Sequence, residues 1–351
     1  MMAGAARIGN IEILEWASKD RYRKILHYSN GYPYLQRFRQ LGELVYDEAC
    51  TGGNLEVIEW LENNNCHVSE QSICIAARHG YEKILDFLLM VGTGEITYEL
   101  KEEAAFGGHF EIVKKYYSDS VGESLAKYGA QYGNIEFIKW LQDRRELIDL
   151  EDCGNYALKF GQLETIKWLQ TQGWACPRTA CDLAAVSGSI DVVQWAKSNG
   201  SYCSEKTVIK AAKNGHISLI KWLRENGCPW SAQTTQKVAL KCQGLQVLKW
   251  LIENNCPLEI QRNSTADGLN FPISSLDLVR KGNFKVIMYL KQYGLYLDPA
   301  CYTCFKRHWK RNLWFSEWLY ENGCPLDVLL TEVNDSFYDN ILEWIKAKTE
   351  K

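Results

Sequence analysis

A repeat of about 27 residues constrains the fold of this 351-residue chain more than any other feature of its sequence. Each full copy begins with a glycine, which we call the anchor glycine, and has a tryptophan seven residues later. The full copies run Gly53 to Trp60, Gly133 to Trp140, Gly161 to Trp168, Gly188 to Trp195 and Gly215 to Trp222. Weaker copies start at Gly9, Gly80, Gly108 and Gly282, or keep only Trp250, Trp318 and Trp344. Because nine of the thirteen tryptophans share one position, the chain is a repeat array.

Each repeat predicts two helices. The segment after the anchor glycine has its apolar residues on one helical face, as in Ile217-Ser-Leu-Ile-Lys-Trp222-Leu. An Asn-Gly pair then ends this second helix, and Gly227 suits a left-handed cap. The first helix precedes the anchor glycine and ends in small residues such as Ala211-Ala212, which allow close helix approach. One pair cannot bury its own apolar face, so we expect an all-α stack of about 12 helix-turn-helix repeats.

The repeat resembles an ankyrin repeat. The run from Thr179 to Ala185 (Thr-Ala-Cys-Asp-Leu-Ala-Ala), followed by Gly188-Ser-Ile-Asp-Val-Val193, is similar to the ankyrin consensus Thr-Pro-Leu-His-x-Ala-Ala and Gly-His-Leu-Glu-Val-Val. The likeness covers nearly the whole chain, but the period is about 27 rather than 33 residues. The missing residues fall where ankyrin repeats carry a β-hairpin finger. The chain therefore resembles the short, tryptophan-rich ankyrin variants of large DNA viruses, amoebae and oomycetes.

This resemblance implies an ankyrin-like α-solenoid with shortened or absent fingers, and a non-enzymatic function. We expect a protein-protein interaction module or scaffold that binds a host or cellular protein through its concave helix surface. Two loop tryptophans, Trp174 and Trp230, are candidate exposed anchors for such a partner, because Trp is enriched in binding hot spots. The alternative is that each ring caps the neighbouring loop.

The whole chain, 1–351, is expected to be a single array, with regular repeats over 44–256 and degenerate repeats over 300–351. The irregular segment 17–43 is either a worn repeat around Gly31 or a basic, aromatic patch. The insertion 259–270 contains the turn signal Asp267-Gly268, two further candidate partner-binding residues. It is interpreted either as a projecting loop or as a tolerated insertion. The alternative function is nucleic-acid or acidic-ligand binding through the basic segments 19–39 and 306–311.

The sequence lacks the motifs that would indicate catalysis, so we expect no enzyme activity and no cofactor. Cys301, Cys304 and His308 fall short of the four ligands of a structural zinc site, so no metal is expected. The loop cysteines Cys66, Cys228, Cys256 and Cys324 lie at one equivalent point of their repeats. Equivalent positions in neighbouring repeats are about 8–10 Å apart, whereas a disulfide needs Cα atoms within about 7 Å. We therefore expect free thiols. The net charge of −3 and the lack of a signal peptide or membrane segment predict a monomeric cytoplasmic protein (host cytoplasm if viral).

Overall fold

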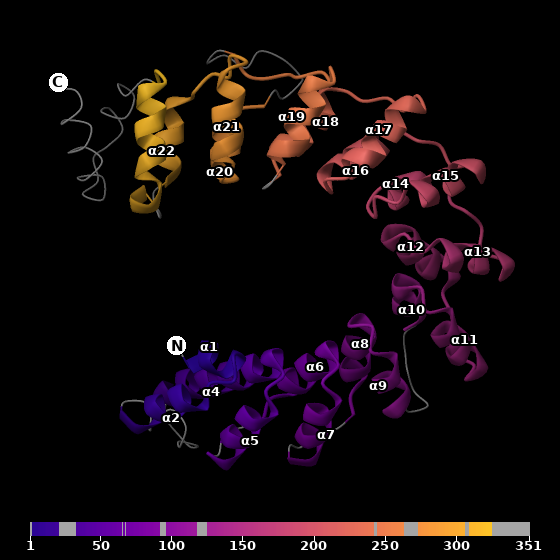
Figure 1. Ribbon diagram of the computed structural model, residues 1–351, viewed down its shortest axis with the longest axis vertical. Helices are drawn as coiled ribbons and strands as arrows, with labels where there is room; N and C mark the ends of the chain where they lie inside the picture. Colours follow the sequence, from indigo (N-terminus) through magenta and orange to yellow (C-terminus); the bar gives the residue numbers. More distant parts are fainter. Residues whose placement is uncertain are drawn as a thin grey trace. The chain divides into compact units, whose positions relative to one another are not determined.

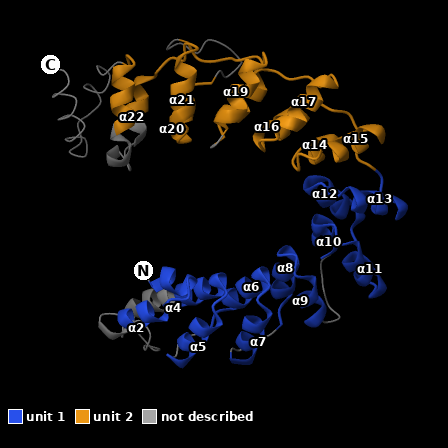
Figure 2. Ribbon diagram, viewed as in Figure 1, with its two compact units in different colours: residues 1–175 blue, residues 176–351 orange. Residues whose placement is uncertain are grey.

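The computed structural model describes residues 2–20, 33–64, 66, 68–91, 96–117, 125–241, 244–262, 273–305 and 309–324. For 18–20, 33–41, 303–305 and 309–313, only the backbone is described. The chain divides into an N-terminal unit, residues 1–175, and a C-terminal unit, residues 176–351 (Figure 2). The single array expected over residues 1–351 stays a prediction.

The two units consist of helix pairs, as the repeat predicts. In the N-terminal unit the first helices are α1 (Met2–Arg7), α4 (Pro33–Gly52), α6 (Glu70–His79), α8 (Tyr98–Phe106), α10 (Ala126–Tyr132) and α12 (Leu150–Phe160). The second helices there are α2 (Ile11–Asp20), α5 (Leu55–Asn63), α7 (Glu82–Val91), α9 (Phe110–Lys115), α11 (Ile135–Asp143) and α13 (Leu163–Thr171).

The C-terminal unit continues the same order of elements. Its first helices are α14 (Ala180–Ala184), α16 (Glu205–Lys213), α18 (Ala232–Ala239), α20 (Ser275–Arg280) and the 3₁₀ helix η1 (Pro299–Phe305). Its second helices are α15 (Ile190–Ser198), α17 (Ile217–Glu225), α19 (Leu245–Glu253), α21 (Phe284–Lys291) and α22 (Trp309–Glu321). Outside these helices, the described residues contain a single parallel bridge, between Ile260 and Ile273, and no β-strand.

The core lies between successive helix pairs. First helices pack on first helices, for example α4 on α6 and α6 on α8, and each also packs on its own second helix. In the N-terminal unit, α4, α6 and α8 form one row and α5, α7 and α9 a second row (Figure 1). The paired alanines and the residues four, five and eight positions after the anchor glycine are buried, as in Val57, Ile58 and Leu61. The repeated tryptophans, Trp60, Trp140, Trp168, Trp195 and Trp222, are only half-buried, so they border the core rather than fill it.

A hydrogen-bond ladder joins the end of one first helix to the next repeat. In several repeats, the residue after the anchor glycine donates to a carbonyl at the end of the first helix of the preceding repeat. Asn54 Nδ2 lies 2.9 Å from Arg7 O, and Gln162 Nε2 lies 2.9 Å from Gln131 O. These carbonyls have no partner within their own helix, so the ladder satisfies groups that a helix end leaves open.

The anchor glycines adopt a left-handed backbone conformation. Gly53, Gly133, Gly161, Gly188 and Gly215 all have positive φ, between 73° and 83°. Only glycine adopts this left-handed conformation without steric cost. The expected cap at Gly227 is also left-handed, with φ of 77°. Just before an anchor, Gly52 leaves no room for a side chain, because a Cβ there would overlap the carbonyl oxygen of Arg7.

Part of the irregular segment belongs to a longer first helix. Residues 33–43 belong to α4, one 20-residue helix that runs on to Gly52. Helix α4 packs directly on α1, and Asn54 reaches Ala6 and Arg7, so these two first helices are neighbours. Residues 21–32, which include Gly31, lie outside the described residues, so the worn repeat stays a prediction.

The insertion after α19 is fastened where it begins and ends. Gln261 N donates to Ile273 O at 2.9 Å, and Ile273 N donates to Glu259 O at 3.0 Å. Tyr296 N, after α21, donates to Gln261 O at 2.8 Å. Asp267 and Gly268 lie outside the described residues, so their role as partner contacts stays a prediction.

Candidate functional site

The first helices of the N-terminal unit carry a continuous row of rings. Phe106 of α8 meets Tyr128 of α10 edge to face, with ring centroids 5.9 Å apart. Tyr128 meets Tyr156 of α12 at 6.2 Å, and Tyr156 stacks on Phe160 at 6.4 Å. The Arg78 guanidinium of α6 lies 5.1 Å from the centre of the Phe106 ring. We call these five residues, Arg78, Phe106, Tyr128, Tyr156 and Phe160, the aromatic surface.

Polar contacts hold the aromatic surface in place. Arg78 forms an ion pair with Glu103, in which Nη2 donates to Oε1 at 2.8 Å. The Tyr128 hydroxyl donates to Glu102 Oε1 at 2.8 Å. Burial, followed by this bond to a carboxylate, raises the pKa of Tyr128, so its hydroxyl stays protonated as a donor. Both acids belong to α8, so the contacts link α8 to α6 on one side and to α10 on the other.

The first and last rings of the aromatic surface face solvent. Phe106 is 45% exposed and Phe160 is 50% exposed, whereas Tyr128 between them is buried. Two lysines add charge, since Lys127 and Lys159 place Nζ 5.1 Å and 5.4 Å from the centres of the Tyr128 and Tyr156 rings. Exposed rings held rigidly beside cations offer apolar area and cation–π partners at low entropic cost. The arrangement is suited to contact with another macromolecule.

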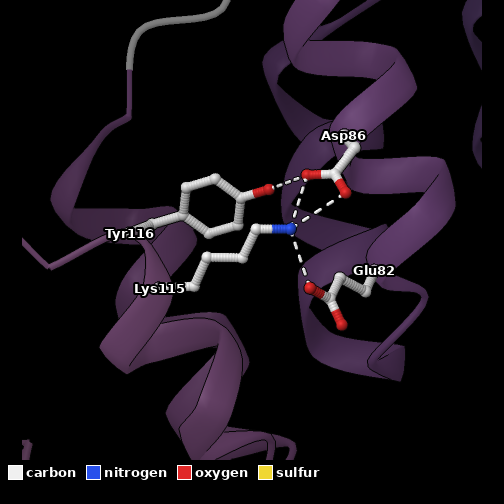
Figure 3. A network of polar contacts seen from close by, with 4 residues as sticks. All are labelled: Glu82, Asp86, Lys115 and Tyr116. Atoms are coloured by element: carbon white, nitrogen blue, oxygen red, sulfur yellow. Dashed lines mark hydrogen bonds and ion pairs between the residues drawn. The ribbon is translucent and has the colours of Figure 1, made fainter.

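On the second helices of the same unit, polar side chains are paired with one another. Lys115 of α9 donates to Glu82 Oε1 at 2.7 Å and to both Asp86 oxygens at 2.9 Å, and the Tyr116 hydroxyl also donates to Asp86 (Figure 3). The bond from Tyr116 and then that from Lys115 lower the pKa of Asp86. Because these polar groups bind one another, they fasten α9 to α7 rather than present a vacant site.

Trp174 is not the exposed anchor that its loop position suggested. It is only 7% exposed, and its ring lies over Gly154 of α12, where a Cβ would overlap it. Trp174 follows the left-handed Gly173, and its N–H donates back to Leu169 O at 3.1 Å, which turns the side chain inward. The buried Cys66, Cys228, Cys256 and Cys324 occupy the same position in other repeats. This shared position was the sequence feature that indicated the burial of Trp174.

Trp230 is half-buried and held by its neighbours. The Arg224 guanidinium lies 4.1 Å from the centre of its ring, and the Trp250 ring centre is 6.3 Å away. It therefore combines partial exposure with packing in its own loop. Its role as a partner contact stays a prediction.

Much of the two basic segments lies outside the described residues. Residues 21–32 and 306–308 lie outside the described residues, and only the backbone is described for Lys19, for 33–39 and for 309–311. Nucleic-acid binding through 19–39 and 306–311 stays a prediction for this reason.

The cysteines in the described residues form no disulfide. Burial raises the pKa of Cys66 and Cys256 to about 12, so both thiols stay protonated. Cys301 is buried, and its thiol lies 3.5 Å from Ser275 Oγ. The side chains of Cys304 and His308 are not described. Elsewhere in the described part, no three His, Cys, Asp or Glu side chains are placed to hold a metal ion.

Sequence reasoning missed the aromatic surface, whose residues sit at different offsets in different repeats. Phe106 lies two residues before its anchor glycine, Tyr128 and Tyr156 lie five before theirs, and Phe160 lies one before. The available signal was the number of aromatic residues at the ends of the first helices between residues 98 and 160. These residues form a surface only where the first helices of adjacent repeats lie side by side.

The class of protein follows from the helix pairs, which define a helical-repeat protein. No protein-family model and no curated protein matches the sequence. Among solved structures the chain is similar to the pentatricopeptide repeat protein PPR10 from maize, with 13% sequence identity and a TM-score of 0.35. The similarity covers 99% of this chain and 57% of that one, so the chain spans less than two thirds of its length. At this TM-score the likeness supports no inference about function. None of the described helices is long and apolar enough to cross a membrane.

Proposed function

We propose that the chain is a non-enzymatic, ankyrin-like scaffold that binds another protein along the first helices of its N-terminal unit. The observation that carries this proposal is the aromatic surface, in which rings from α8, α10 and α12 are in contact and the rings at both ends are exposed. Aromatic and arginine side chains dominate protein-binding hot spots, especially when their neighbours hold them rigid.

Stacked repeats suit this function because a partner can contact several of them at once. The aromatic surface spans four first helices, from Arg78 of α6 to Phe160 of α12. Neighbouring helices lie about 8–10 Å apart, so four helices extend over about 25–30 Å. That length fits a partner helix or extended segment of ordinary size.

Affinity capture with matched variants tests the proposal. The double substitution Phe106→Ala and Phe160→Ala removes both exposed rings and leaves the buried Tyr128. The control, Met90→Ala with Leu147→Ala, removes two exposed apolar side chains elsewhere in the same unit, 74% and 88% exposed. We expect the parent and control chains to retain a common protein from the native cell that the Phe106/Phe160 variant loses. Equal retention by all three chains would refute the aromatic surface as the binding site.

A further inference from the structure

The two units carry opposite net charge. Residues 1–175 contain 18 Lys and Arg against 26 Asp and Glu, whereas residues 176–351 contain 22 against 17. Part of the positive charge of the C-terminal unit lies on two adjacent first helices, α16 and α18. Lys210, Lys213, Lys237 and Lys241 lie in or directly after the last turns of these helices, and we call them the lysine strip.

The N-terminal unit shows how the same position is neutralised there. Arg7 lies two residues before its anchor glycine, and it pairs with Glu48, five residues before the next anchor, at 3.7 Å. Arg78, also two residues before its anchor, pairs with Glu103 in the same register. In these two repeats a cation at the end of a first helix meets a carboxylate from the next repeat, whereas Lys159, at the same position before Gly161, lies over the Tyr156 ring.

The lysine strip lacks the carboxylate partners that Arg7 and Arg78 have. Lys213 lies two residues before Gly215. In the next repeat, the position that Glu48 and Glu103 occupy in theirs is taken by Val238, which has no carboxylate. In the repeat of Lys213, the carboxylate position is itself a lysine, Lys210. None of the four lysines forms an ion pair with a described carboxylate, whereas Arg280, in the next first helix, pairs with Asp277 at 3.7 Å.

Like charges therefore accumulate on one surface. Lys210 and Lys213 are three residues apart on α16, a spacing at which like charges repel. Lys237 lies in α18, and Lys241 lies two residues after the end of that helix. Lys241 Nζ donates to the carbonyl of Lys213, so the ends of α16 and α18 are adjacent. The C-terminal end of each helix carries a partial negative charge that favours a nearby lysine. This partial charge does not replace a full carboxylate such as Glu48 or Glu103 of the N-terminal unit.

We infer that the lysine strip binds an acidic segment of a partner protein, whose Asp or Glu side chains take the place of the missing carboxylates. The chain itself uses glutamate at this position, so a carboxylate is the ligand that the geometry already accommodates. Single-stranded nucleic acids are instead bound with aromatic side chains on which bases stack, and neither α16 nor α18 contains an aromatic residue. The strip is separate from the aromatic surface, so this inference stands or falls independently of the proposed function.

Fluorescence anisotropy with four labelled probes tests the inference on the full chain. The probes are an oligoglutamate peptide, oligoglutamine and oligolysine peptides of the same length, and a single-stranded oligouridylate. The test variant carries Lys210→Glu, Lys213→Glu and Lys237→Glu, and keeps Lys241 because its ammonium group holds a carbonyl. The control variant carries Lys197→Glu, Lys221→Glu and Lys285→Glu, which make the same change in charge on second helices of the same unit.

We expect oligoglutamate to bind the parent and control chains and to bind the test variant about tenfold more weakly, since like charges at an interface are strongly unfavourable. Oligolysine should bind the test variant more tightly than the control variant of equal net charge, a gain that misfolding could not produce. Equal losses in both variants would overturn the inference, and so would oligoglutamine binding as tightly as oligoglutamate. Tighter binding of oligouridylate than of oligoglutamate would overturn it in favour of a nucleic-acid surface.

Discussion

The imidazole Nε2 of His216 lies 2.8 Å from the carbonyl oxygen of Val186, one repeat earlier in the chain. The same ring covers Gly188, where a Cβ would overlap it. His216 therefore connects two repeats at the point where the backbone of the earlier one turns. Gln162 makes the equivalent bond to Gln131 in the N-terminal unit. This contact spans the boundary between neighbouring repeats.

Loss of this bond should weaken the stack. His216→Ala removes one inter-repeat hydrogen bond and part of the packing on Gly188, so we expect the free energy of unfolding to fall by about 1–2 kcal/mol. His216→Gln should restore most of the loss, because glutamine fills this position at Gln162. Urea denaturation followed by circular dichroism measures both variants. Equal destabilisation by Ala and Gln would show that the hydrogen bond contributes little.

Two helix ends carry a side chain where the other repeats have glycine. Arg145 and Asn255 have φ of 60° and 63°, at the position of Gly173, Gly200 and Gly227. Arg145→Gly should raise the free energy of unfolding by up to about 1 kcal/mol, because the left-handed strain is relieved and the Arg145 side chain is exposed. Asn255→Gly should gain less, since asparagine tolerates this conformation better.

Gly200 provides the reverse experiment. A Cβ at Gly200 would meet no atom within 4 Å, but φ is 88°. Gly200→Ala should therefore cost about 1 kcal/mol through backbone strain alone. An unchanged melting temperature in this variant would contradict the account of the helix ends.

The two loop tryptophans should respond differently to truncation. Trp174→Ala opens a cavity beside Gly154 and should cost about 3–5 kcal/mol. Trp230→Ala removes a half-buried ring and its cation–π contact with Arg224, so we expect a cost of about 1–2 kcal/mol. Thermal unfolding of the two variants compares these costs. A larger loss for Trp230 would contradict the burial of Trp174.

Stability should depend on pH through Asp47. Burial raises the pKa of this carboxyl, although Ser72 and Ser69 donate to it. The folded state therefore holds the proton more tightly than the unfolded state. This group contributes its full stability below the ordinary carboxyl pKa, and the contribution is lost as pH rises through the raised folded pKa.

Asp47→Asn removes this titration and leaves an oxygen that can accept from Ser72. Its stability relative to the parent should rise with pH across that window, as measured by urea denaturation at several pH values. Glu59→Gln, on the exposed side of α5, controls for the loss of one charge. A stability difference between Asp47→Asn and the parent that does not change with pH would contradict the prediction.

Local backbone requirements could be predicted from the sequence, and side-chain surroundings could not. The cap at Gly227 and the helix before it follow from a few neighbouring residues, so the repeat pattern sufficed. The direction of Trp174 depends on α12 packing over the loop, a contact between segments separated in sequence. The aromatic surface combines Phe106, Tyr128 and Tyr156 from three repeats, and its members have no common sequence position. The length of α4 was not predicted either, because nothing in the sequence of 33–43 marks it as part of the first helix of the Gly53 repeat.

Amide hydrogen exchange with and without the captured partner tests most directly the claim that the first helices of the N-terminal unit bind a protein. The account predicts slower exchange in α8, α10 and α12, residues 98–106, 126–132 and 150–160, in the complex of the parent chain. The second helices α9, α11 and α13 should change little and serve as internal controls. Protection confined to those second helices, or to segments 19–39 and 306–311, would contradict the account.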